Sequence, residues 1–250
     1  AALVISLMAV VLMGSLAFLV FNKSPQSLGQ HPDNATSLEP GATTASAASW
    51  TAAQTLKSAK FRSLAAGMSL GLFAQIGLIA HLYSILAGRM GAQDASFAMG
   101  LATASAMGGR FIAARLMSRG VDRRQLACLG YAIQMGGTLM LLGLDSHPAV
   151  AWAAVLLIGS GIGNATSLPP LIAQTEFSRE QTAKVIALMV AISQATYAFA
   201  PASFGLIRAS LSNPGEAIVA LVIAAVAVQT LAILSFHLGS TARSVGKANY

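Results

Sequence analysis

Long apolar runs and short polar connections alternate along the chain. The apolar runs occupy residues 1–21, 64–87, 95–118, 126–144, 149–175, 185–207 and 217–238. At ~1.5 Å per residue, runs of this length cross the ~30 Å hydrocarbon core of a bilayer. No alternation of apolar and polar positions indicates barrel strands, and helices satisfy all their own backbone groups in lipid. The pattern therefore predicts an all-α protein with seven transmembrane helices.

Residues 22–60 separate the first run from the other six and differ from both in composition. Ser, Thr, Ala, Gly and Gln dominate, and Pro25, Pro32 and Pro40 prevent a long helix. We expect a solvated and largely disordered linker between a transmembrane helix over 1–21 and a six-helix bundle over 61–250. The end of the linker, SWTAAQTLKSAKFRSL, sets apolar against basic residues and favours a short helix on the membrane surface.

Composition supports an integral membrane protein and excludes several other classes. Hydrophobic residues make up 55% and charged residues only 9%, against ~25% charged in soluble domains. The net charge of +7 comes from basic residues at the ends of apolar runs, so no nucleic acid is expected. The single Cys128 excludes an internal disulfide, and the four histidines lack metal-ligand spacing. We expect no metal, no cofactor and no enzymatic chemistry.

The lysines and arginines are distributed unequally between the two sides of the seven-span pattern. Only Arg89 and Arg208 of the 15 fall on the side opposite the linker. Basic residues concentrate in cytoplasmic connections. We therefore expect the linker and the C-terminus in the cytoplasm, with the chain in the inner (cytoplasmic) membrane of the cell.

One arginine lies deep inside an apolar run. Arg110 stands ~12 Å above the cytoplasmic end of the run over 95–118, where a charge is costly and indicates function. At ~100° per residue, Arg115 and Arg119 lie ~140° and ~180° away, whereas Met99, Thr103 and Ala114 share its face. We interpret this face as the lining of a water-filled cavity, with Arg110 contacting an anionic solute. The alternative is a structural bond to helix-terminal carbonyls or to an acid in the gate.

Other polar residues also fall within the apolar runs. Gln75, Gln134 and Tyr197 lie near the middle of their runs, and Gln194 shares a helix face with Tyr197. They are candidates for a central solute site, and the alternative is interhelical hydrogen bonds worth ~0.6 kcal/mol each. His81 lies ~7 Å from the outer end of its run and is a candidate carrier of a coupling proton.

Small residues four positions apart predict close helix contacts, because backbones approach one another there. Such spacing joins Gly67 to Gly71, forms a ridge of Gly100, Ala104 and Gly108, and joins Gly159 to Gly163.

The segment SAMGGRFIAARLMSRGVDRR resembles the loop signature of the major facilitator superfamily, in the copy between the eighth and ninth of twelve helices. Ser118 stands where that family has an acid, and one extra residue precedes Arg123 and Arg124. The segments LGLFAQIGLIAHLYSIL, GNATSLPPLIAQTEF and QATYAFAPASFG are similar to bacterial members near the monocarboxylate and oxalate/formate branch.

This resemblance implies that 1–21 is the family's sixth helix, 22–60 its cytoplasmic middle loop, and the rest its C-terminal bundle. It implies a secondary transporter that moves a small solute by alternating access, with an organic anion as the candidate class. The partners would be a coupling proton or an exchanged anion, the lipid bilayer and the missing N-terminal half. Arg110 matches a substrate-related arginine of carboxylate carriers, and the loop motif comprises Arg115, Arg119, Asp122, Arg123 and Arg124.

Two other functions fit the count of spans. One is a seven-helix receptor or light-driven pump, although the retinal type needs a lysine within the membrane and every lysine here lies outside the runs. The other is a membrane scaffold that does not transport.

Overall fold

The computed structural model describes residues 51–247, with side chains up to Gly239, together with Met8, Val11, Leu12, Gly14 and Ser15. The chain divides into two compact units, residues 1–48 and 49–250, which are treated separately. The five described positions of the first unit are helical. Otherwise the predicted first span and the linker up to residue 50 lie outside the described residues.

The second unit consists of helices. They are α2 (Ala52–Lys57), α3 (Ala59–Met90), α4 (Ala92–Ser118), α5 (Arg123–Met140), the 3-10 turn η3 (Leu141–Gly143), α6 (Pro148–Glu176), α7 (Arg179–Tyr197), α8 (Ala200–Ala209) and α9 (Pro214–Lys247). Residues 51–247 contain no strand, so the predicted all-α class is confirmed.

Each of the six predicted runs after the linker coincides with a long helix or a helix pair. Five of these are long and apolar enough to cross a membrane: α3, α5 with η3, α6, α7 with α8, and α9 up to Gly239. The exception is α4, which has 27 residues but carries Asp94, Arg110 and Arg115 among many small and polar residues. The helix that carries Arg110 is thus the one long helix of residues 51–247 without an apolar stretch long enough to cross a membrane, as expected for one that faces water or protein.

Local chemistry explains where the helices end. Gly91 and Gly120 have φ of +85°, a conformation that residues with a Cβ rarely adopt. Gly91 ends α3, and Gly120 lies in the turn between α4 and α5. Asp122 then caps α5 by accepting bonds from the backbone N–H groups of Arg124 and Gln125. Pro148 and Pro214 occupy first-turn positions of α6 and α9, where a missing N–H costs nothing.

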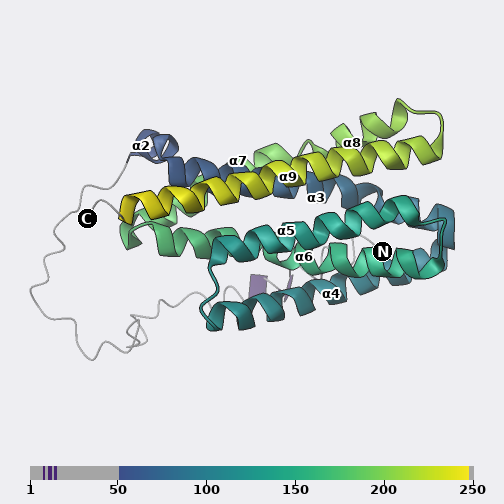
Figure 1. The fold of residues 1–250 in the computed structure, drawn as a ribbon, viewed down its shortest axis with the longest axis horizontal. Coiled ribbons are helices and arrows are strands. Elements are labelled where there is room, and N and C mark those ends of the chain that lie inside the picture. The colour runs from purple at the N-terminus through teal and green to yellow at the C-terminus, as the bar shows by residue number, and fades with distance from the viewer. Residues whose placement is uncertain (1–7, 9–10, 13, 16–50, 248–250) are drawn as a thin grey trace, which may run out of the picture. The chain divides into compact units, whose positions relative to one another are not determined.

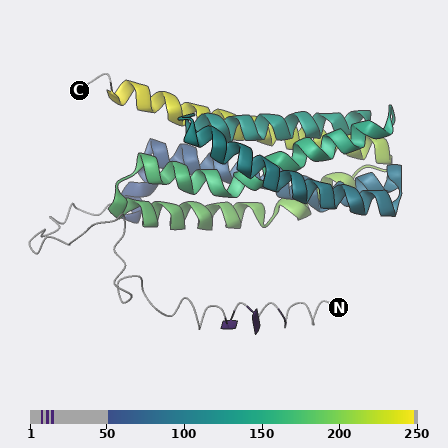
Figure 2. The ribbon, with the colours of Figure 1, turned by 90° about the horizontal axis from the view of Figure 1, so that it is seen from below.

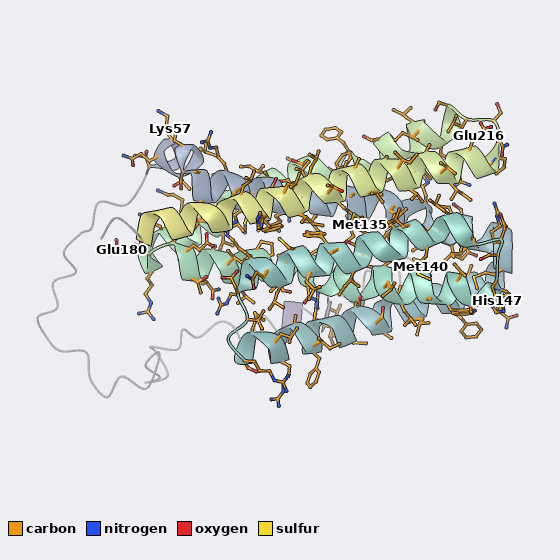
Figure 3. All side chains as sticks on the ribbon, in the orientation of Figure 1. Lys57, Met135, Met140, His147, Glu180 and Glu216 are labelled. Atoms are coloured by element: carbon orange, nitrogen blue, oxygen red, sulfur yellow. The ribbon has the colours of Figure 1, made fainter. Side chains whose placement is uncertain are left out.

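The long helices run side by side and alternate in direction, as Figures 1 and 2 show. α3 packs against α9, α7, α8 and α4, while α6 packs against α5 and α4. The side-chain view places Lys57 and Glu180 at one end of this bundle and His147 and Glu216 at the other (Figure 3). Two apolar clusters fill the interior. One is centred on Leu82, Ile158 and Leu221, and the other on Leu64, Leu168 and Phe236.

The predicted surface helix at the end of the linker is divided in the structure. Thr51 and Gln54 form a reciprocal capping box that starts α2, and Ser58 separates α2 from α3. Phe61, expected on the membrane side of that helix, is 1% exposed within the bundle core. Its burial makes this segment part of the bundle.

Candidate functional site

A close crossing of α4 and α6 supports the candidate site. A Cβ on Gly109 would lie 2.0 Å from the carbonyl oxygen of Ser160, and one on Gly159 would lie 2.4 Å from that of Ala102. Asn164 reinforces the crossing by donating a 3.1 Å hydrogen bond to the carbonyl oxygen of Gly109. Only glycine allows two helix backbones to approach so closely. This crossing fixes the position of the residues that follow on α4.

Arg110 is attached to this crossing by one hydrogen bond. Its Nε donates to the carbonyl oxygen of Gly163 over 2.8 Å. A Cβ on Gly163 would lie 2.7 Å from Arg110 Cγ, so glycine is required for the side chain to lie where it does. A guanidinium carries five N–H donors, and the four on its terminal nitrogens bond to no residue that the structure describes. These four donors are therefore available to a ligand.

Arg110 lines a groove between α3, α4 and α6 with a volume of about 350 Å³. Met99 and Thr103 share the lining, as the helical spacing predicted, whereas Ala114 does not. The rest of the wall is apolar, with Leu82 and Ile162 among its members, and it contains no carboxylate. An apolar wall with a single guanidinium suits a small anion that has an apolar body.

Gln75 and Gln134 do not line this groove. They are 3% and 0% exposed, and Gln134 Nε2 donates to Gln75 Oε1 over 3.2 Å between α5 and α3. This arrangement favours the interhelical hydrogen bond over a role in solute binding. Gln134 Oε1 is buried without a partner among the described residues, but neither amide reaches the wall of the groove at Arg110.

The basic loop after α4 brings together residues that the sequence pattern separated. Arg124, 2% exposed, forms a bidentate pair with Glu176 at 2.6 Å (Nε to Oε1) and 2.8 Å (Nη2 to Oε2). Its Nη1 donates to Ser63 Oγ and to the carbonyl oxygen of Phe236, both over 3.1 Å. One guanidinium therefore joins α5 to α3, α6 and α9 at this end of the bundle.

The other members of the loop motif have different surroundings. Arg123 donates to the carbonyl oxygen of Leu171 on α6, and Asp122 serves as the cap of α5. Arg115 and Arg119 are exposed. The motif thus combines a structural part, formed by residues 122–124, with an exposed basic part at the end of α4.

Comparison with known proteins agrees with this arrangement. The family model of the Major Facilitator Superfamily matches residues 1–201, which is most of the 250-residue chain. The chain belongs to the Major Facilitator Superfamily. No curated protein and no solved structure matches it.

Membership has direct consequences for this chain. It is a multi-pass membrane transporter that acts on a small solute in a lipid bilayer. Members of the superfamily are generally not enzymes, and a receptor function loses its support.

The remaining candidate residues of the transporter lie near a break between α7 and α8. The predicted run over 185–207 is interrupted after Tyr197, and α8 restarts at Ala200 with Pro201 in its first turn. Gln194 is exposed and Tyr197 is half-buried, and neither lines the groove around Arg110. His81 lies 3.3 Å (Nε2) from the carbonyl oxygen of Pro201, so it connects α3 to the start of α8.

Sequence reasoning missed Glu176 and Gln229. Glu176 ends α6 at the end of the bundle where Arg124 lies in the first turn of α5, so matching helix ends would have indicated the pair. Gln229 on α9 is 0% exposed, and neither atom of its amide has a partner among the described residues. Its place within an apolar run was the available signal, because buried amides in lipid usually find partners.

Proposed function

We propose that this chain is the C-terminal part of a secondary transporter for a small organic anion, with Arg110 in contact with the solute. The observation that carries the proposal is the Arg110 guanidinium. It lies on the wall of an apolar groove of about 350 Å³, it makes a single bond to a carbonyl, and no described carboxylate pairs with it. A carboxylate fits the free terminal donors, because guanidinium and carboxylate form parallel charge-assisted hydrogen bonds.

The monocarboxylate and oxalate/formate branch suits this chemistry. A monocarboxylate carries one charge for the guanidinium and a short apolar body for neighbours such as Leu82, Met99 and Ile162. Desolvating that body stabilises binding by ~25 cal/mol per Å² of buried apolar surface. The guanidinium charge would set the orientation of the bound solute, and the apolar wall would limit the size of the solute that is accepted.

The exposed side of α4 supports a missing N-terminal half. Phe97, Met107 and Phe111 are 63%, 64% and 75% exposed on α4, which has no apolar stretch long enough to cross a membrane. The predicted ridge residues Gly100 and Gly108 have open space where a Cβ would be. Large apolar groups beside open glycines suit a second helix packed against α4. Alternating access would then move the two halves about the groove.

Orientation and energy source complete the proposal. The excess of basic residues on the linker side favours a cytoplasmic linker and C-terminus in the inner membrane. Transport is driven by a coupling proton or by exchange for another anion. His81, hydrogen-bonded across to α8, is the candidate for carrying the proton.

Uptake of labelled monocarboxylates and oxalate by the full-length protein in proteoliposomes tests the role of Arg110. We expect Arg110→Ala to abolish saturable uptake and Arg110→Lys to raise KM, because a lysine retains the charge but loses the planar donor pair. Arg62→Ala is the matched control, since Arg62 is an exposed arginine at the start of α3. Unaltered uptake by Arg110→Ala would remove this arginine from the mechanism.

A further inference from the structure

Two arginines meet at the end of the bundle that is poorest in basic residues. Arg89 and Arg208 are the pair that the sequence places opposite the linker, on α3 and α8. In the structure they line one cavity of about 280 Å³, together with Ser84 and the first turns of α9. Basic side chains repel one another, so their convergence at a sparsely charged surface needs an explanation.

The partners of the two arginines leave the cavity positive. Arg89 forms an ion pair with Asp145, a carboxylate that is 75% exposed and outside the cavity lining. Arg208 donates to the neutral hydroxyl of Ser84 and pairs with no carboxylate that the structure describes. Glu216, in the first turn of α9, is not part of the wall. One uncompensated positive charge therefore remains at the cavity.

The level of this cavity corresponds to the boundary of the apolar core. Arg89 and Arg208 each stand one residue before the end of their helix. Figure 3 marks the same end of the bundle with His147 and Glu216. At this level a bilayer presents the phosphate groups of its lipids.

The other part of the wall is apolar. Ile85 of α3 and Ile218 and Leu221 of α9 line it, below the two arginines along their helices. A ligand with a phosphate at one end and hydrocarbon at the other matches this division.

We propose that this cavity binds the phosphate group of an anionic phospholipid, with Arg208 as the principal contact and Arg89 as the second. A free phosphate ion shares the chemistry of the head, and the experiment below separates the two sources. The site is distinct from the groove at Arg110, because the two cavities have no lining residue in common. A lipid bound here would contact α3, α8 and α9 together and stabilise the packing of their ends.

Thermal unfolding of the purified full-length protein, delipidated in detergent, measures the binding. It is titrated separately with phosphatidylglycerol, phosphatidylcholine and inorganic phosphate, and native mass spectrometry counts retained lipid. We expect phosphatidylglycerol to raise the unfolding temperature, with a weaker response to phosphatidylcholine and less binding at high salt. A response to inorganic phosphate as strong as that to phosphatidylglycerol would contradict the lipid and leave a free-anion site.

Three variants assign the response to the cavity. Arg208→Gln should weaken phosphatidylglycerol binding about tenfold, the loss expected for one charge-assisted contact. Asp145→Asn should strengthen it, because Arg89 is released from its ion pair. Lys57→Gln, at the opposite end of the bundle (Figure 3), is the matched control and should bind as the wild type does. Equal binding by Arg208→Gln and Lys57→Gln, or no gain with Asp145→Asn, would overturn the proposal.

Discussion

Substituting Gly163 by alanine separates α4 from α6 at the candidate site. The added Cβ would lie 2.4 Å from the carbonyl oxygen of Ala106 and 2.7 Å from Cγ of Arg110. The carbonyl oxygen belongs to the backbone of α4 and cannot rotate away as a side chain does. Ordinary contact begins at 3.4 Å, so the two helices must move apart by about 1 Å locally.

The cost of this movement has two parts. Overpacking of a close helix crossing costs ~1–3 kcal/mol. The hydrogen bond from Arg110 Nε to the carbonyl oxygen of Gly163 is lost or lengthened, which adds ~0.5–1.5 kcal/mol. The sum of about 1.5–4.5 kcal/mol corresponds to a fall in unfolding temperature of roughly 3–18 °C for a chain of this size.

Thermal unfolding of the full-length protein, followed by the helical circular dichroism signal, measures the change. Gly136→Ala is the matched control, since Gly136 lies inside α5 and has open space where its Cβ would be. We expect Gly136→Ala to stay within ~1 kcal/mol of the wild type. Uptake by Gly163→Ala should fall as well, because Arg110 loses the hydrogen bond that holds it to α6. Equal unfolding temperatures of the two variants would refute this account of the crossing.

Three further predictions concern the interior of the bundle. Glu176→Gln should lower the free energy of unfolding by ~3–5 kcal/mol in denaturation experiments, because it leaves Arg124 buried without a counter-charge. The double variant Arg124→Met, Glu176→Leu should lower it by less. A double variant less stable than Glu176→Gln would argue against this account. Gln229→Leu should leave the unfolding temperature unchanged or raise it. Gln134→Leu should lower the free energy of unfolding by ~1–3 kcal/mol, because it leaves the amide of Gln75 unpaired. Equal effects of the two variants would show that Gln229 also has a partner. His81→Gln should lower uptake driven by an imposed pH gradient and spare solute exchange, and unchanged gradient-driven uptake would exclude His81 as the proton carrier.

The polar residues within the apolar runs show the limit of sequence reasoning at the candidate site. Helical periodicity correctly grouped Arg110 with Met99 and Thr103, because these positions share a face of one helix. It did not distinguish them from Gln75 and Gln134, which lie at similar depths but bond to each other in the core. Depth along a helix follows from counting residues, whereas the neighbour that covers a face depends on packing.

The spacing of glycines along the chain predicted some of the close helix contacts and not others. Gly67 and Gly71 contact the rings of Phe236 and Tyr131, and Gly163 contacts Arg110, so these small residues do lie at close contacts. Gly100 and Gly108, in an equivalent spacing, have nothing against them among the described residues. Gly109 makes the contact instead, one position away and therefore ~100° round the helix.

The sequence by itself determined the helices, their approximate ends and the unequal distribution of charge. It could do so because a backbone in lipid must bond within its own segment and because charges avoid the hydrocarbon. Only the tertiary structure decided which polar groups meet. It joined Arg124 of α5 to Glu176 at the end of the neighbouring α6, and it brought Arg89 and Arg208 to one cavity. These encounters depend on how helices distant in sequence rotate and cross, which side-chain packing determines and local pattern does not.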